Sequence, residues 1–301
     1  MPFVHSHLPR RNPILNAKYK GILCILSAAF FFALMALFVR LAGDLPSIQK
    51  SFFRNLVAAV AAAFLLLRDR RPIAMDGKSW FFLILRAAFG TLGVLCNFYA
   101  VDHLLLADAS MLSKMSPFFA ILFSFLLLKE RISLFQAGAV LAAFGGCVLI
   151  MRPTGLAMEL LPAFIGLLGG AAAGLAYTIV RLLSQRGVRG PFIVFFFSAF
   201  SCLVTLPFLL FSYHPMTGQQ LAYLLLAGAA AAGGQFSVTA AYSFAPAREL
   251  SVYDYSQVLF SALLGFLCFQ QIPDLLSWVG YTVICSAAAA MFLHTRRHAQ
   301  S

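Results

Sequence analysis

Apolar stretches of about 20 residues follow one another along almost the whole chain, separated by short polar links. An α-helix of this length crosses the hydrocarbon core of a bilayer, which is about 30 Å thick, at a rise of about 1.5 Å per residue. The pattern therefore predicts an all-α membrane protein with about ten transmembrane helices. The predicted spans are Gly21–Leu41, Ile48–Leu67, Trp80–Val101, Leu106–Leu128, Leu134–Met151, Leu161–Leu183, Phe192–Phe211, Leu221–Phe244, Ser251–Phe269 and Leu275–Leu293.

Composition supports a membrane protein. Of the 301 residues, 61% are hydrophobic and 11% are charged, whereas about a quarter of a soluble protein is charged. The net charge of +12 comes mainly from the links, so we expect a lipid bilayer around the chain and no nucleic acid as a partner. The six cysteines lie in apolar stretches without metal-ligand spacing, so no metal site and no cofactor is expected.

Basic residues alternate between the two predicted membrane sides. Sixteen of the 22 Lys and Arg residues fall on the side of the N-terminus, and three fall on the opposite side. Because cytoplasmic loops carry the excess of Lys and Arg, both termini are predicted to be cytoplasmic. The expected location is the plasma membrane of a bacterium, as an integral multi-pass protein.

The second half of the chain repeats the first at an offset of about 140 residues. Tyr99 and Tyr242 each end a span, and a short link and a polar span start follow. A repeat with an odd number of spans is inverted relative to the next, an architecture typical of secondary transporters with a site near the midplane. The predicted parts are a cytoplasmic N-terminal segment (1–20), two five-helix repeats (21–151 and 161–293) and a cytoplasmic tail (294–301).

Four segments share a pattern with a known family: the segment that starts at Tyr99, Ser113–Pro117, Leu126–Arg131 and Phe52–Arg54. They resemble the EamA-like family of the drug/metabolite transporter superfamily. The second half departs from the family pattern, because Gln271 stands where a glutamate is usual and Leu259 or Phe260 replaces the equivalent of Pro117. The resemblance implies ten helices, cytoplasmic termini and a central cavity lined mainly by spans one, three, four, six, eight and nine.

Four charged side chains lie at least three residues inside predicted spans. A charge at the centre of a span costs roughly 2.5–3.5 kcal/mol, so such residues are candidates for function. Lys114 lies about 12 Å inside its span and is the best cavity candidate. Arg54 and Arg86, about 9 Å in, are either cavity residues or anchors that snorkel to the interface. Asp254, about 5 Å in, is either a proton-coupling carboxylate or a favourable charge at a helix N-terminus.

Pro117 marks an irregularity beside Lys114. Proline removes a backbone hydrogen bond to the carbonyl of Ser113 and kinks the helix, so Pro117 is a candidate hinge. Ser110 and Ser113 share one helix face with Lys114 and Pro117. This polar stripe predicts either a substrate cavity or a kink that packs against another helix.

The repeat predicts that the ninth span supplies the opposing wall of the cavity. Gln257 is expected to align with or next to Lys114, on the same face as Asp254, and Tyr255 could stack on a planar substrate. Asn97, Tyr177 and Gln235 are weaker candidates for the cavity wall. The candidate substrate-binding residues are thus Lys114, Ser113, Ser110, Gln257, Tyr255, Asp254, Arg54, Arg86, Asn97 and Tyr177, with no catalytic and no metal-binding residues.

Small residues recur at helical spacing in two spans. Gly166, Gly170 and Gly174 form one ridge, and Ala142 and Gly146 form another. Such ridges let helix backbones approach closely in lipid. We therefore expect both to be helix-packing surfaces.

The combined pattern predicts a secondary transporter that moves a small organic metabolite by alternating access. Anionic or zwitterionic cargo is favoured, because the charges within spans are mostly basic. The sequence contains no Walker motif and no catalytic constellation, so neither ATP hydrolysis nor enzyme activity is expected. A multidrug exporter, a lipid or lipid-carrier flippase and a membrane receptor or scaffold remain alternatives, and a homodimer is also open.

Overall fold

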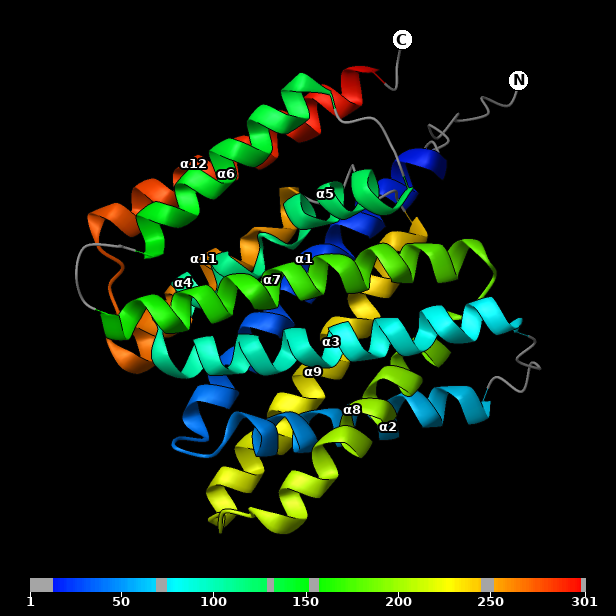
Figure 1. The fold of residues 1–301 in the computed structure, drawn as a ribbon, viewed down its shortest axis with the longest axis vertical. Coiled ribbons are helices and arrows are strands. Elements are labelled where there is room, and N and C mark those ends of the chain that lie inside the picture. Colours follow the sequence, from blue (N-terminus) through cyan, green and yellow to red (C-terminus); the bar gives the residue numbers. More distant parts are fainter. Residues whose placement is uncertain (1–12, 69–74, 129–132, 152–156, 245–251, 299–301) are drawn as a thin grey trace, which may run out of the picture.

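Every element that the computed structural model describes is a helix (Figure 1). The described residues are 13–68, 75–128, 133–151, 157–244 and 252–298. The helices are α1 (Pro13–Leu41), α2 (Ser47–Arg68), α3 (Gly77–His103), α4 (Leu106–Ser113), α5 (Ser116–Leu128), α6 (Leu134–Met151), α7 (Ala157–Gln185), α8 (Gly190–Phe211), α9 (Gly218–Phe244), α11 (Ser256–Phe269) and α12 (Leu275–His298).

Eight helical segments of the described chain are long and apolar enough to cross a membrane. They correspond to all predicted spans except the fourth and fifth. The fifth, Leu134–Ile150, is a shorter apolar helix. The fourth is divided into α4, of 8 residues, and α5, of 13 residues. The all-helical membrane fold is therefore confirmed.

The division of the fourth span recurs 140 residues later. Residues 252–254 form a helical turn that ends at Tyr255, before α11 begins. At each break, two backbone N–H groups donate to carbonyls three residues earlier. These bonds are Met115 to Leu112 (3.1 Å) and Phe118 to Met115 (3.0 Å) in the first half, and Tyr255 to Val252 (3.3 Å) and Val258 to Tyr255 (3.0 Å) in the second. The proline predicted only a kink in the first half, and the second break forms without a proline.

Each helix of the first half packs against a helix of the second. The most extensive contacts join α1 to α9, α3 to α7, α2 to α8 and α6 to α12. In Figure 1, α6 and α12 lie side by side at the top of the bundle, and α3 and α7 run together through its middle. The core is therefore built between the halves rather than within either one.

Glycines on α7 allow the broken fourth span to approach closely. A Cβ atom added at Gly170 would lie 2.5 Å from the carbonyl oxygen of Leu112, and one at Gly174 would lie 2.5 Å from that of Ser116. These two carbonyls flank the break between α4 and α5. The predicted packing role of the glycine ridge is confirmed. The second ridge also packs closely, because a Cβ at Gly146 would lie 3.0 Å from the carbonyl oxygen of Gly280.

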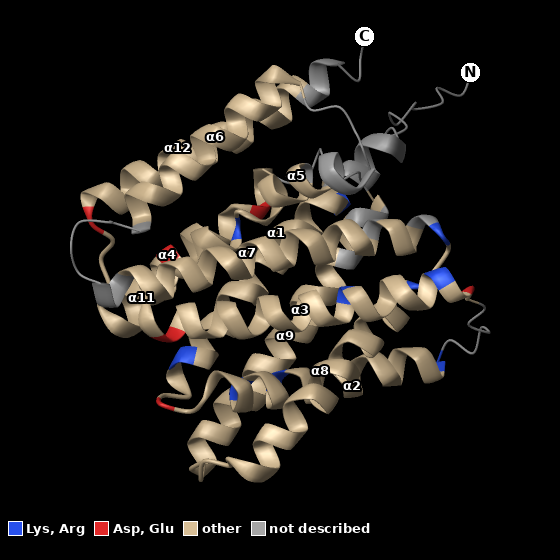
Figure 2. Ribbon diagram, in the orientation of Figure 1, with Lys and Arg blue, Asp and Glu red and all other residues tan. Residues whose placement is uncertain are grey.

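Charged residues lie mainly towards helix ends and turns, and most of the ribbon has none (Figure 2). We call the end of the bundle where α3 begins and α7 ends the terminal side. The end that holds the turns α1–α2, α3–α4, α8–α9 and α11–α12 is called the far side. Among the described residues, side-chain hydrogen bonds join several helices on the far side, and Asp76 and Arg186 form an ion pair on the terminal side.

Candidate functional site: a charged cavity between two helix breaks

A cavity of about 100 Å³ lies inside the bundle. The predicted spans one, three, four, six, eight and nine all contribute to its wall, as the resemblance implied. Two further helices also contribute, α2 through Arg54 and α8 through Phe197. The lining residues that carry polar or charged side chains are Arg54, Arg86, Asn97, Ser113, Lys114, Ser116, Tyr177, Gln235 and Gln257.

Lys114 and Asp254 form an ion pair between the two helix breaks. The ammonium of Lys114 lies 2.7 Å from the Oδ2 atom of Asp254, and the two side chains are 9% and 16% exposed. The two residues are 140 positions apart and occupy the same place in the two breaks. The pair therefore joins equivalent points of the two halves at the cavity.

This pairing corrects two predictions from the sequence. Gln257 was expected to align with or next to Lys114, but Asp254 takes that place and Gln257 corresponds to Pro117. The predicted difference in depth, with Asp254 close to one membrane surface and Lys114 near the midplane, was also wrong, because the two side chains are in contact. Counting residues from the first apolar position assumes straight helices along the membrane normal, and both spans are broken beside these residues.

Ser110, Tyr255 and Pro117 lie outside the cavity lining. The hydroxyl of Ser110 is 2.6 Å from that of Ser261, so these serines join α4 to α11. Tyr255 is buried in a cluster of hydrophobic residues, and its hydroxyl donates to the carbonyl of Lys114 at 3.1 Å. In this conformation the Tyr255 ring packs within the protein and its hydroxyl helps to hold the break.

Arg54 and Arg86 are buried in the bundle and only 2% and 4% exposed. The snorkelling alternative is therefore wrong for both. The guanidinium carbon of Arg86 lies 3.9 Å from the centre of the Phe197 ring, and that of Arg54 lies 5.8 Å from the same centre. Stacking on an aromatic face stabilises a cation but supplies no hydrogen-bond acceptor.

A buried amide holds Arg54 in place. Its Nη1 atom donates to the side-chain oxygen of Asn55 at 2.6 Å. The Asn55 amide nitrogen in turn donates to the Ser51 carbonyl at 2.9 Å and to the Ser201 hydroxyl at 2.8 Å. This network fixes Arg54 between α2 and α8 while leaving its charge without a carboxylate partner among the described residues.

Two buried contacts were missed in the sequence. Asp108, near the start of α4, is 6% exposed and accepts a hydrogen bond of 2.6 Å from the hydroxyl of Tyr281. Phe197 gave no signal in a chain with 32 phenylalanines. Asp108 could have been noticed, because a carboxylate within an apolar span requires a partner.

Several hydrogen bonds between elements hold the far side together. Lys50 is fully buried and lies 2.6 Å from Asp102, joining α2 to α3. Arg40, near the end of α1, donates to the carbonyls of Val101 and Leu104. Similar links, in donor-to-acceptor order, are Gln49 to the His214 carbonyl, the His214 N–H to Gln49, Gln220 to the Ala42 carbonyl and the Leu106 N–H to Gln271.

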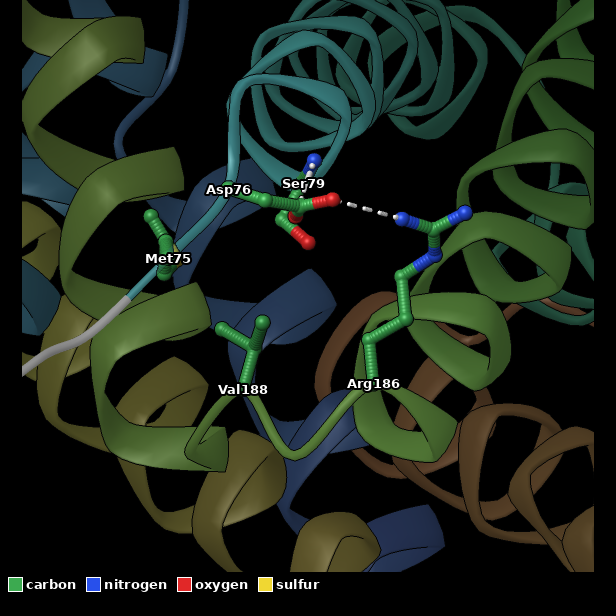
Figure 3. A pocket seen from close by; sticks show the side chains of 5 residues that line it. All are labelled: Met75, Asp76, Ser79, Arg186 and Val188. Atoms are coloured by element: carbon green, nitrogen blue, oxygen red, sulfur yellow. Dashed lines mark hydrogen bonds and ion pairs between the residues drawn. The ribbon is translucent and has the colours of Figure 1, made fainter.

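A separate pocket of about 320 Å³ lies between the start of α3 and the end of α7, on the terminal side (Figure 3). Asp76 accepts a hydrogen bond from the Ser79 N–H at 3.0 Å and caps α3. Arg186 lies 3.3 Å from the same carboxylate. Hydrogen bonds from Ser79 and the nearby charge of Arg186 lower the pKa of Asp76. Both side chains are well exposed, so the central cavity is the stronger candidate for a transport site.

The sequence profile of the EamA-like transporter family matches residues 19–152 and 160–293, which together are most of the chain. The chain belongs to this family. It is 33% identical over 280 residues to the pseudopaline exporter of Pseudomonas aeruginosa, covering 92% of this chain and 98% of the exporter. It is 26% identical over 298 residues to human solute carrier family 35 member G1, covering 93% of this chain and 80% of the carrier.

A solved crystal structure has the same fold. Its TM-score is 0.64 at 20% sequence identity, and the match covers 93% of this chain and 98% of the other. The family and its named relatives identify this chain as an integral membrane transporter for a small-molecule substrate and not as an enzyme.

Proposed function

We propose that this transporter is a secondary carrier that moves a small organic anion or zwitterion by alternating access. The main support for this function is the cavity at the two helix breaks. Arg54, Arg86 and Lys114 line the cavity, and Asp254 is bound to Lys114. The name of the relative in P. aeruginosa, an exporter, supports an organic metabolite as cargo. The basic lining favours anions and zwitterions over the cationic substrates of a multidrug exporter.

Two five-helix halves of inverted orientation form the carrier. In the repeat, α1, α2, α3 and α6 correspond to α7, α8, α9 and α12. If the two halves are exchanged, the α1–α9 contact therefore becomes the α7–α3 contact, and the α2–α8 and α6–α12 contacts stay the same. The shared hydrogen-bond pattern of the two breaks supports the same relation. Inverted repeats with discontinuous helices at the midplane are common in secondary transporters, because they allow two mirrored open states.

The conformation described here is closed on the far side. One ion pair and the hydrogen bonds of Arg40, Gln49 and Gln220 join α1, α2, α3, α9 and the α8–α9 turn there. Release to that side requires these bonds to break, and we assign the far side to the cell exterior because the basic links lie on the terminal side. The Lys114–Asp254 pair lies where the halves meet and couples cargo binding to the movement of the halves. Protonation of Asp254 or binding of cargo releases the Lys114 ammonium.

A flux measurement tests this function. Cells with and without the gene are compared by metabolite profiling, and solutes that differ are tested for movement into proteoliposomes that contain the purified protein. We expect at least one small acid or zwitterion to move without ATP. A protein that changes no metabolite pool, and moves no solute in proteoliposomes, would favour the receptor or scaffold alternative.

A further inference from the structure

Arg86 is a buried cation for which the described part of the chain supplies no hydrogen-bond acceptor. Its Nε and Nη1 atoms are inaccessible and have no hydrogen-bond partner among the described residues, and its guanidinium group stacks on the ring of Phe197. The Nε atom of Arg54 is also inaccessible and unpartnered. An uncompensated charge in a low-dielectric interior is strongly unfavourable, so buried charges are normally paired. These two arginines are therefore an exception that calls for an external partner.

The rest of the cavity wall does not supply that partner. Asn97 and Gln257 carry neutral amides, and Tyr177 carries a neutral hydroxyl. The carboxylate of Asp254 is already bound to the lining residue Lys114 at 2.7 Å. Among the described lining residues, the two guanidinium charges thus remain uncompensated.

We propose that Arg54 and Arg86 together bind a carboxylate group of the transported solute; this rests on the proposed function. A guanidinium group is planar and its N–H donors match the two oxygens of a carboxylate. Phe197 lies against both groups and keeps them beside the cavity. Phe32, Phe98 and Val94 also line the cavity and suit an apolar body behind the acid group.

Gly90 makes room for this arrangement. A Cβ atom added there would lie 2.5 Å from the Nη1 atom of Arg86 and 2.9 Å from the ring of Phe197. An alanine at this position would displace the guanidinium and the ring together while both arginine charges remain. Gly90→Ala is therefore a geometric test of the site that leaves its charge unchanged.

Replacing an arginine that binds substrate and replacing an arginine that stabilises the fold should change the melting temperature of the ligand-free protein in opposite directions. Arg86→Gln removes an unpaired buried charge, so the ligand-free variant should melt at a higher temperature than the wild type. An arginine that stabilises the fold through Phe197 would instead lower the melting temperature when replaced. The matched control is Arg186→Gln, directly after α7 and outside the cavity, whose side chain is 36% exposed.

The experiment measures thermal unfolding of the purified full-length protein in detergent with three carboxylates and their amides. The pairs are propionate and propionamide, succinate and succinamide, and benzoate and benzamide, with inorganic phosphate as a further probe. We expect at least one carboxylate to stabilise the wild type and the Arg186→Gln variant, and its amide to have no effect. With Arg86→Gln or Gly90→Ala, at least ten times more carboxylate should be needed for the same rise in melting temperature.

Three results would overturn the carboxylate site: equal effects of acids and amides, stabilisation by phosphate alone, or carboxylate binding that Arg86→Gln leaves unchanged. Flux separates this inference from the proposed function. Carboxylate binding without movement of any solute would refute transport and leave the site in place. Movement of solutes that lack an acid group, at the same rate in Arg86→Gln, would refute the site and leave transport in place.

Discussion

Removing one partner of the Lys114–Asp254 pair should destabilise the protein far more than removing both. The two charged groups are 2.7 Å apart and their side chains are 9% and 16% exposed. Lys114→Met or Asp254→Asn leaves the other charge buried without a partner, which costs about 3–5 kcal/mol. The double variant contains neither charge, so it should recover most of this loss. The free energy of unfolding in mixed micelles measures all three variants.

The same variants separate stability from transport. Both single variants and the double variant should lose flux in proteoliposomes, because all three lack the pair that couples the halves. The exchanged pair Lys114→Asp with Asp254→Lys should restore stability, since the two positions are equivalent in the two breaks. Arg186→Gln, which removes an exposed pair, should leave the free energy of unfolding almost unchanged.

A small loss of unfolding free energy in the single variants would contradict a stabilising role for the Lys114–Asp254 pair. If each single variant lowers the free energy of unfolding by less than about 1 kcal/mol, the pair adds no more stability than a surface ion pair does. The buried contact would then not hold the two breaks together. Single variants that transport at the wild-type rate would also contradict a role for the pair in coupling.

Three further predictions concern packing, closure and topology. Gly170→Ala should cost about 1–3 kcal/mol, because its Cβ would lie 2.5 Å from the Leu112 carbonyl oxygen, whereas Gly138→Ala, with no atom within 4 Å, should be neutral or stabilising in the same unfolding assay. Lys50→Met breaks the buried pair with Asp102 and should speed hydrogen–deuterium exchange at the far end of α3; unchanged exchange would argue against a closed far side. Reporter fusions at both termini should be active in the cytoplasm, and an exterior C-terminus would contradict the inverted repeat.

The membrane fold could be predicted from the chain because apolar length and the distribution of basic residues are local properties of the sequence. Glycine spacing on α7 likewise predicted close packing, and the backbone contacts of Gly170 and Gly174 confirm it. Pro117 predicted only a kink, whereas the structure has a break between Ser113 and Ser116. The break at Tyr255 carries no proline and follows from its surroundings, including the hydroxyl that it donates to the Lys114 carbonyl.

The candidate site was harder to predict, because its contacts join residues far apart in the chain. Lys114 and Asp254 were both singled out as charges within spans, but their pairing depends on how two broken helices meet. The sequence could not decide whether Arg54 and Arg86 snorkel, because that depends on which neighbours cover them. Phe197 illustrates the limit, since only its position under two guanidinium groups distinguishes it from the other phenylalanines.

Transport at the meeting point of the two halves is tested by counterflow in proteoliposomes of a solute identified by metabolite profiling. Exchange is measured with wild-type protein and with Lys114→Ala. Equal amounts of folded protein are reconstituted, as judged by size-exclusion chromatography. We expect rapid exchange of a small acid or zwitterion by the wild type and no exchange above empty vesicles by the variant. Equal exchange by the two proteins would contradict a transport site at the meeting point of the two halves.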